Sequence, residues 1–171
     1  MNLTTKAADS LPESARSRTG ALTVWFERQS HIPGVPPSPD DAQRVPQMRR
    51  LVEARLRSCG LEGLIDPMLL VTSELVTNAL RHGTGTGVSL LLSSNATTAR
   101  LTVSDGSAQH RTPRLAPPDA ESGRGLHIVS LIACEYEGSW GVSSDLTQTW
   151  CTLTTPAPTP APTPSRGAGA P

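Results

Sequence analysis

The chain has no excess of charge and no long apolar run, and both absences restrict its function. Of its 171 residues, 15 are Lys or Arg and 15 are Asp or Glu, so the formal net charge is zero. Proteins that bind nucleic acid usually carry a basic excess or a basic stripe, so we expect no nucleic-acid partner. No apolar segment approaches the roughly 20 residues of a membrane span, and residues 1–20 lack the apolar core of a signal peptide. We therefore expect a cytoplasmic protein without membrane contact.

Cysteine is also scarce, and its positions show no metal or disulfide pattern. Cys59, Cys134 and Cys151 are odd in number and far apart, and no CxxC pair or Cys/His cluster has the spacing of zinc ligands. Each stands in an apolar stretch. This predicts small, buried side chains that stay reduced.

Proline, in contrast, is abundant and marks the limits of the part that can fold. Residues 155–171 form a Pro/Ala/Thr-rich tail that cannot bury a core, and residues 1–20 are small and polar. We expect a disordered arm over 1–20, one domain over 21–154 and a disordered tail over 155–171. Four prolines in His31–Asp41 predict a connector inside the domain.

Within the domain, apolar periodicity predicts helices and short strands. Two amphipathic helices are expected at about 42–59 and 67–82, with Gly60 and Gly83 as stop signals and Asp66 as the N-cap of the second. The remaining elements are a helix at 126–134 and strands at 21–27, 87–92, 100–104, 135–140 and 147–154.

The segment ELVTNALRH, Glu74–His82, is the first motif with chemical content. Glu74, Asn78 and His82 stand four residues apart, so they line one helix face over about 12 Å. Asn78 can offer its carbonyl oxygen to Mg²⁺, and Glu74 can orient or deprotonate a nucleophile beside metal-bound phosphates. Taken alone, such residues are more often the solvated face of an amphipathic helix, so other motifs must support this interpretation.

Two further motifs follow along the chain. LTVSDG places Asp105 at the end of a strand, where a carboxylate can accept a hydrogen bond from an exocyclic amine such as that of adenine. The same Asp-Gly pair is also a common turn signal. GRGLHIV, Gly123–Val129, puts glycines before a helix whose free N–H groups can face phosphate oxygens, although a lone GxG is a common loop-to-helix junction.

The order ELVTNALRH, then DGS at a strand end, then GRGLHIV resembles the GHKL (Bergerat-fold) ATPases over about Val45–Leu153. Within that family, the chain looks most like the actinobacterial relatives of the anti-sigma-factor serine kinases. The resemblance implies a two-layer α+β fold with a mixed, mostly antiparallel sheet and helices packed on one face. It also implies ATP and Mg²⁺ as ligands.

The resemblance further implies roles for single residues. Glu74 would be the catalytic base, Asn78 the magnesium ligand and Asp105 the adenine-reading acid, with a glycine hinge for a lid over the phosphates. One departure from the family pattern is Ser107, which stands where D-x-G-x-G has its first glycine. The implied nucleotide-binding set is Asn78, Asp105, Gly106, Gly123, Arg124, Gly125, Leu126 and Thr149.

Two functions follow from this resemblance. The first is a serine/threonine kinase that binds an alternative sigma factor and phosphorylates a STAS-domain antagonist, with homodimerisation as a further expectation. The second is a nucleotide-binding regulatory module without catalysis that sequesters a protein partner. Phosphate transfer to a STAS protein separates them.

Overall fold

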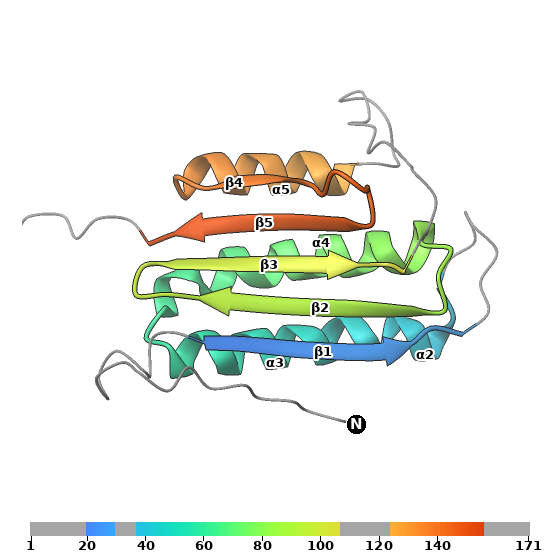
Figure 1. Cartoon of the computed structure of the whole chain (residues 1–171). Helices are drawn as coiled ribbons and strands as arrows, with labels where there is room; N and C mark the ends of the chain where they lie inside the picture. The colour runs from blue at the N-terminus through green and yellow to red at the C-terminus, as the bar shows by residue number, and fades with distance from the viewer. Residues whose placement is uncertain (1–19, 30–36, 107–123, 156–171) are drawn as a thin grey trace, which may run out of the picture.

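The structure, a computed structural model, describes residues 20–29, 37–106 and 124–155. Their strands form one sheet in the order β1-β2-β3-β5-β4, and every neighbouring pair is antiparallel. The long helices cover one face of that sheet (Figure 1). The expected two-layer α+β architecture is confirmed, and all the pairs of the described sheet are antiparallel rather than mixed.

In chain order the elements are β1 (Gly20–Glu27), α2 (Pro39–Ala42), α3 (Arg44–Ser58), the 3-10 turn η1 (Glu62–Leu64), α4 (Ile65–His82), β2 (Gly87–Ser94), β3 (Thr98–Ser104), α5 (Arg124–Glu135), β4 (Ser139–Val142) and β5 (Gln148–Thr154).

Local signals account for where α3 begins and ends. Pro46 lies in the first turn of α3, where its missing N–H is not needed by the helix. At the other end, Gly60 has a φ of +69°, and the Leu61 N–H donates to the Leu56 carbonyl over 3.0 Å. A left-handed residue that closes the last turn in this way is a common helix stop and favours glycine. The predicted stop at Gly60 is therefore confirmed.

Three boundary predictions were wrong. Strand β1 already begins at Gly20, which was assigned to the disordered arm. Asp66 is not the N-cap of α4, because η1 leads directly into the helix and the cap position falls on Leu64. The strand expected at 135–140 starts later, since α5 continues to Glu135 and the chain turns at Glu137, where φ is +45°, before β4 begins.

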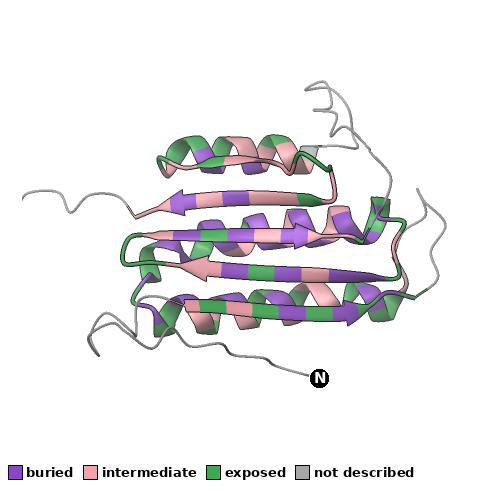
Figure 2. Cartoon of the chain, in the orientation of Figure 1, coloured by how far each residue is buried: buried purple, intermediate pink, exposed green. Residues whose placement is uncertain are grey.

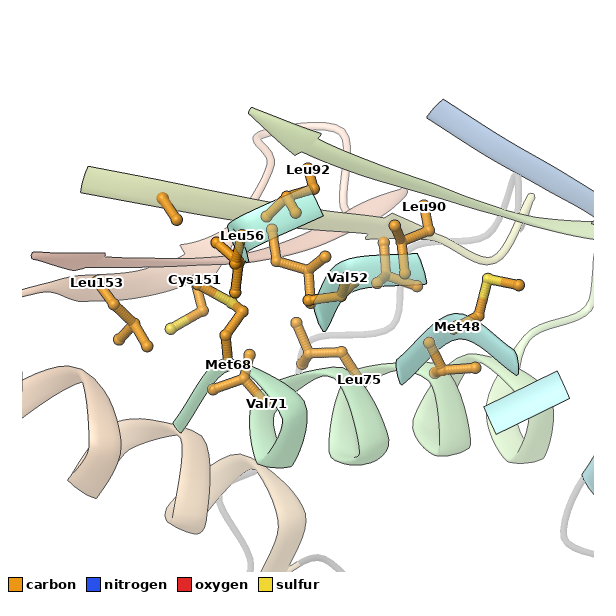
Figure 3. Packing of buried hydrophobic residues seen from close by; sticks show 14 of the residues in the cluster. Met48, Val52, Leu56, Met68, Val71, Leu75, Leu90, Leu92, Cys151 and Leu153 are labelled. Carbon is orange, nitrogen blue, oxygen red and sulfur yellow. The ribbon is translucent and has the colours of Figure 1, made fainter. Parts of the chain in front are cut away.

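The core lies between the sheet and the helices, with α4 packed between α3 and α5. Buried and exposed residues alternate along the strands, as expected for a sheet with one covered face (Figure 2). Figure 3 shows the packing of side chains from α3, α4, β2 and β5: Met48, Val52, Leu56, Met68, Val71, Leu75, Leu90, Leu92, Cys151 and Leu153. Helix α4, which carries the first motif, is therefore held in place by its packing in the core.

The cysteine prediction holds for two of the three residues. Cys59 and Cys151 are buried, but Cys134 is exposed. Helix α5 packs at one side of the layer and buries only its inward positions, among them Val129 and Ile132. Cys134 lies in an apolar stretch of sequence, but it faces outward on this amphipathic helix and is therefore exposed.

None of the helices in the described residues combines the length and the apolar character that a bilayer span requires.

Candidate functional site

Helix α4 presents the first motif at its junction with α5. Val71, Leu75 and Ala79 face the core and are buried, whereas Glu74 and Asn78 are half-buried. Because the two polar residues stand one helical turn apart, their side chains lie one above the other on the same face. A carboxylate and an amide are thus held at a separation that the helix itself sets.

The third motif meets the first at Gly125, in the first turn of α5. A β-carbon added at Gly125 would overlap the Oε2 atom of Glu74 and lie 3.4 Å from the Nδ2 atom of Asn78. The φ angle of Gly125 is outside the left-handed region, so this close approach, rather than backbone conformation, is what requires glycine. The N-terminus of α5 therefore rests directly on the two polar groups of α4.

The carboxyl group of Glu74 has a perturbed proton affinity. Burial raises the pKa of Glu74 above its ordinary value of 4.5, and the positive charge of Arg81 partly opposes that rise. A carboxylate with a raised pKa is a stronger base. Perturbed titratable groups of this kind concentrate at functional sites, which favours a chemical role for Glu74 over a merely solvated one.

The second motif packs against the loop that follows α4. A β-carbon added at Gly83 would lie 2.7 Å from the β-carbon of Asp105, and one at Gly85 would lie 2.5 Å from the carbonyl carbon of Gly106. Gly106 itself has a φ of +67°. The strand end that carries Asp105 and the C-terminal end of α4 are thus in close contact.

A family model described as a histidine kinase-like ATPase domain matches residues 38–150, well over half of the chain. The chain belongs to this family. The match contains all three motifs and begins after β1. A search of curated proteins found no significant match. The protein is accordingly an ATP-binding regulator of the GHKL type, and the three motifs can be placed on the ATPase domain.

The histidine kinase-like domain brings its three motifs to one end of the sheet, at the right of Figure 1. That end holds the C-terminal half of α4, the end of β3 and the first turn of α5. Leu126 is half-buried against the core. Thr149 pairs with the buried Val103 near the end of β3, and directly paired residues share a sheet face, so Thr149 lies on the helix-covered face.

Two members of the implied nucleotide-binding set are less completely described. Arg124 is the first residue of α5, and only its backbone belongs to the described structure. Gly123 lies outside the described residues, as does the loop that contains Ser107. The described members of this implied set therefore lie on α4, directly after β3, on β5 and at the start of α5.

Arg28, directly after β1, is a buried residue beside the candidate site that sequence reasoning missed. Its side chain is only 9 % exposed. Its Nη1 atom donates to the Gly83 carbonyl over 2.6 Å, and its Nη2 atom donates to the Gly85 carbonyl over 2.7 Å. An arginine directly after an apolar strand gave no signal of this role, because its carbonyl partners lie more than 50 positions away in the chain.

The donor set of this ATPase domain fits a magnesium ion that shares its coordination with phosphates. Among the described residues there is no group of three or more His, Cys, Asp and Glu side chains that could hold a metal by themselves. Mg²⁺ is usually bound by one or two protein oxygens together with phosphate oxygens and waters. Asn78, with Glu74 one turn away, supplies that kind of partial oxygen set.

Proposed function

We propose that this ATP-binding regulator is a serine/threonine protein kinase of a partner-switching system, which phosphorylates a STAS-type antagonist of an alternative sigma factor. The observation that carries the proposal is the placement of Glu74. Its half-buried carboxylate has a raised pKa, stands one turn from Asn78 and touches the N-terminal turn of α5. A base, an oxygen ligand for magnesium and a helix N-terminus for phosphate then meet at one place.

In this proposal, Glu74 accepts the proton of the attacking Ser or Thr hydroxyl. The hydroxyl oxygen forms a bond to the γ-phosphorus of ATP, the bond between that phosphorus and the bridging oxygen breaks, and ADP leaves with the electron pair. Magnesium, when bound, neutralises negative charge on the phosphates. Asn78 would hold that ion, and the free N–H groups at the start of α5 would face phosphate oxygens.

Asp105 would supply base recognition at the other end of the site. Its carboxylate can accept a hydrogen bond from the exocyclic amine of adenine, and such a bond to a charged group contributes about 1.5–3 kcal/mol. Helix α4 runs from Glu74 to the loop that contacts Asp105, a distance of about 13 Å at 1.5 Å per residue. One rigid helix therefore sets the spacing between the reacting end and the base-reading end.

A second function is favoured by one sequence observation, the serine at position 107 in place of a family glycine. A domain with this altered motif could bind nucleotide and sequester its protein partner without transferring phosphate. In that case ATP would stabilise the partner surface, and Glu74 would be dispensable for partner binding.

The first test is a calorimetric titration of the full chain with ATP, in the presence and absence of Mg²⁺. For Asp105→Asn, the expected loss of affinity is about ten- to 150-fold, the equivalent of one hydrogen bond to a charged group. Asn78→Ala should lose the magnesium dependence of binding. A folded wild-type protein that does not bind ATP would contradict both candidate functions.

The second test separates the kinase from the inactive module. The protein is incubated with labelled ATP and a STAS-domain protein from the same organism, and transfer to Ser or Thr is measured. Glu74→Ala should retain ATP binding and lose transfer. Glu53→Ala is the matched control, because Glu53 is also a helical glutamate but pairs with Arg57 on α3, away from the site. Transfer that survives Glu74→Ala would remove Glu74 from the role of base, and no transfer by wild type would favour the inactive module.

A further inference from the structure

Arg28 joins the end of β1 to a segment more than 50 residues later in the chain. It directly follows β1, and its guanidinium reaches the last turn of α4 and the loop beyond it. Besides the bonds to Gly83 and Gly85, Nη1 makes a longer contact of 3.4 Å with the Ala79 carbonyl. The Arg28 backbone N–H also donates to the Thr86 carbonyl over 2.9 Å. One residue thus holds the whole segment from the end of α4 to the start of β2.

That segment is the surface on which Asp105 packs. A β-carbon added at Gly83 would lie 2.7 Å from the β-carbon of Asp105 and 2.9 Å from Nη1 of Arg28. Arg28, Gly83 and Asp105 therefore meet at a single point. Gly85, held by the second nitrogen of Arg28, lies against the carbonyl group of Gly106. Any movement of the loop would be passed directly to the strand end that carries Asp105.

We propose that Arg28 is a positioning residue that sets the base selectivity of the nucleotide site. It acts through the Gly83–Gly85 loop, which it holds in place, and this loop fixes Asp105. The inference rests on the proposed role of Asp105 in reading adenine. Adenine presents an amine donor at the position where guanine presents a carbonyl acceptor. A carboxylate held at this place accepts a hydrogen bond from the adenine amine and repels the guanine carbonyl. Selectivity for adenine therefore depends on how firmly Asp105 is held.

The chemistry of arginine suits this task better than that of lysine. A planar guanidinium offers several N–H donors in a fixed fork, so it can bind carbonyls of two loop residues at once. The cation also lies at the C-terminal end of α4, where the helix dipole favours positive charge. Lysine could supply the charge at this place but not the two fixed directions.

The experiment measures dissociation constants for Mg-ATP and Mg-GTP with the full chain, and compares their ratio among variants. Arg28→Met removes the donors and keeps an extended side chain, and Arg28→Lys keeps the charge. Arg100→Met is the matched control, because Arg100 is exposed and stacks on Trp150 with its guanidinium carbon 3.8 Å from the ring centroid. Gly85→Ala tests the loop itself by forcing a β-carbon against Gly106.

We expect wild type and Arg100→Met to prefer ATP to the same extent. The ratio of the dissociation constants for Mg-GTP and Mg-ATP should fall by tenfold or more in Arg28→Met and in Gly85→Ala. Arg28→Lys should fall between these limits. A purely structural role would lower the folded fraction equally for both nucleotides and leave the ratio unchanged. Circular dichroism establishes folding, and if Arg28→Met does not fold, Arg28→Lys and Gly85→Ala decide the question.

The outcomes that overturn the inference are distinct from those that overturn the proposed function. If folded Arg28 and Gly85 variants keep the wild-type ratio, or if wild type binds both nucleotides equally, Arg28 has no role in selectivity while ATP binding stands. If wild type binds neither nucleotide, the proposed function fails and the inference fails with it.

Discussion

Replacing Gly125 with alanine should separate the stability of the fold from the function of the site. The added methyl group would overlap Oε2 of Glu74, the flexible end of a side chain, rather than any backbone atom. Glu74 can therefore move away, but only by leaving the position next to Asn78 that the proposed chemistry requires. We expect Gly125→Ala to stay folded and to lose phosphate transfer.

The magnitudes of the opposing effects are similar. Alanine in place of glycine stabilises a helix interior by about 0.5–1 kcal/mol, and by less in a first turn. Driving Glu74 off its preferred rotamer costs about 0.5–1.5 kcal/mol. The free energy of unfolding of Gly125→Ala should therefore lie within about 1 kcal/mol of wild type. In a Glu74→Ala background the overlap is absent, and the same substitution should be stabilising.

Urea denaturation of the four proteins in this double-mutant cycle measures the coupling between the two positions. The expected coupling free energy is about 0.5–1.5 kcal/mol, the cost of moving the Glu74 side chain off its rotamer. The helix propensity of alanine contributes equally in both backgrounds and cancels. The phosphotransfer assay is run on the same samples. The reasoning is refuted if Gly125→Ala changes stability equally in both backgrounds, or if it transfers phosphate at the wild-type rate.

Three further predictions concern the titration of Glu74, the reactivity of the cysteines and the stability of the core. Because burial raises the pKa of Glu74, the folded protein binds this proton more tightly than the unfolded chain does, and the associated stability is lost as the pH rises from 4.5 through the raised pKa. The Tm of Glu74→Gln relative to wild type should therefore increase between about pH 4 and pH 7, and a constant difference would contradict the shift. In thiol labelling, the exposed Cys134 should react fast. The buried Cys151, whose pKa is raised to about 12, should react slowly. A fast phase of labelling that remains in Cys134→Ser would contradict this prediction. Leu56→Ala in the core should lower the free energy of unfolding by about 2–5 kcal/mol, whereas Leu131→Ala, at a position 57 % exposed, should change it by less than about 0.5 kcal/mol in denaturant titrations.

Features that depend on local rules could be predicted from the sequence. The apolar faces of α3 and α4 follow from residue spacing, and the stop at Gly60 follows from its freedom to adopt a positive φ. The placement of Glu74 beside Asn78 also follows from helical periodicity alone. The two-layer fold required the combination of three motifs in order, because none of them specifies a fold by itself.

Features that depend on distant contacts could not be predicted. The start of β4 was missed because Tyr136 and Trp140 favour a strand, whereas α5 continues to Glu135 and the Tyr136 N–H still donates to the Ile132 carbonyl. The role of Arg28 depends on carbonyl groups that only the fold brings to it. Sequence reasoning likewise named Gly125 for its place before a helix N-terminus, and only the structure shows that a β-carbon there would overlap Glu74.

Helix α4 sets the distance between the residues proposed for phosphate transfer and the residue proposed for base recognition. Glu74 and Asn78 share one helix, so the spacing of their backbone positions is set by α4 alone. Asp105 follows a different element, β3, and lies against the loop that Arg28 holds. Mutations around that loop could therefore retune which nucleotide base is accepted while the reacting groups stay in register. In evolutionary terms, base preference and phosphate chemistry could change independently within this domain.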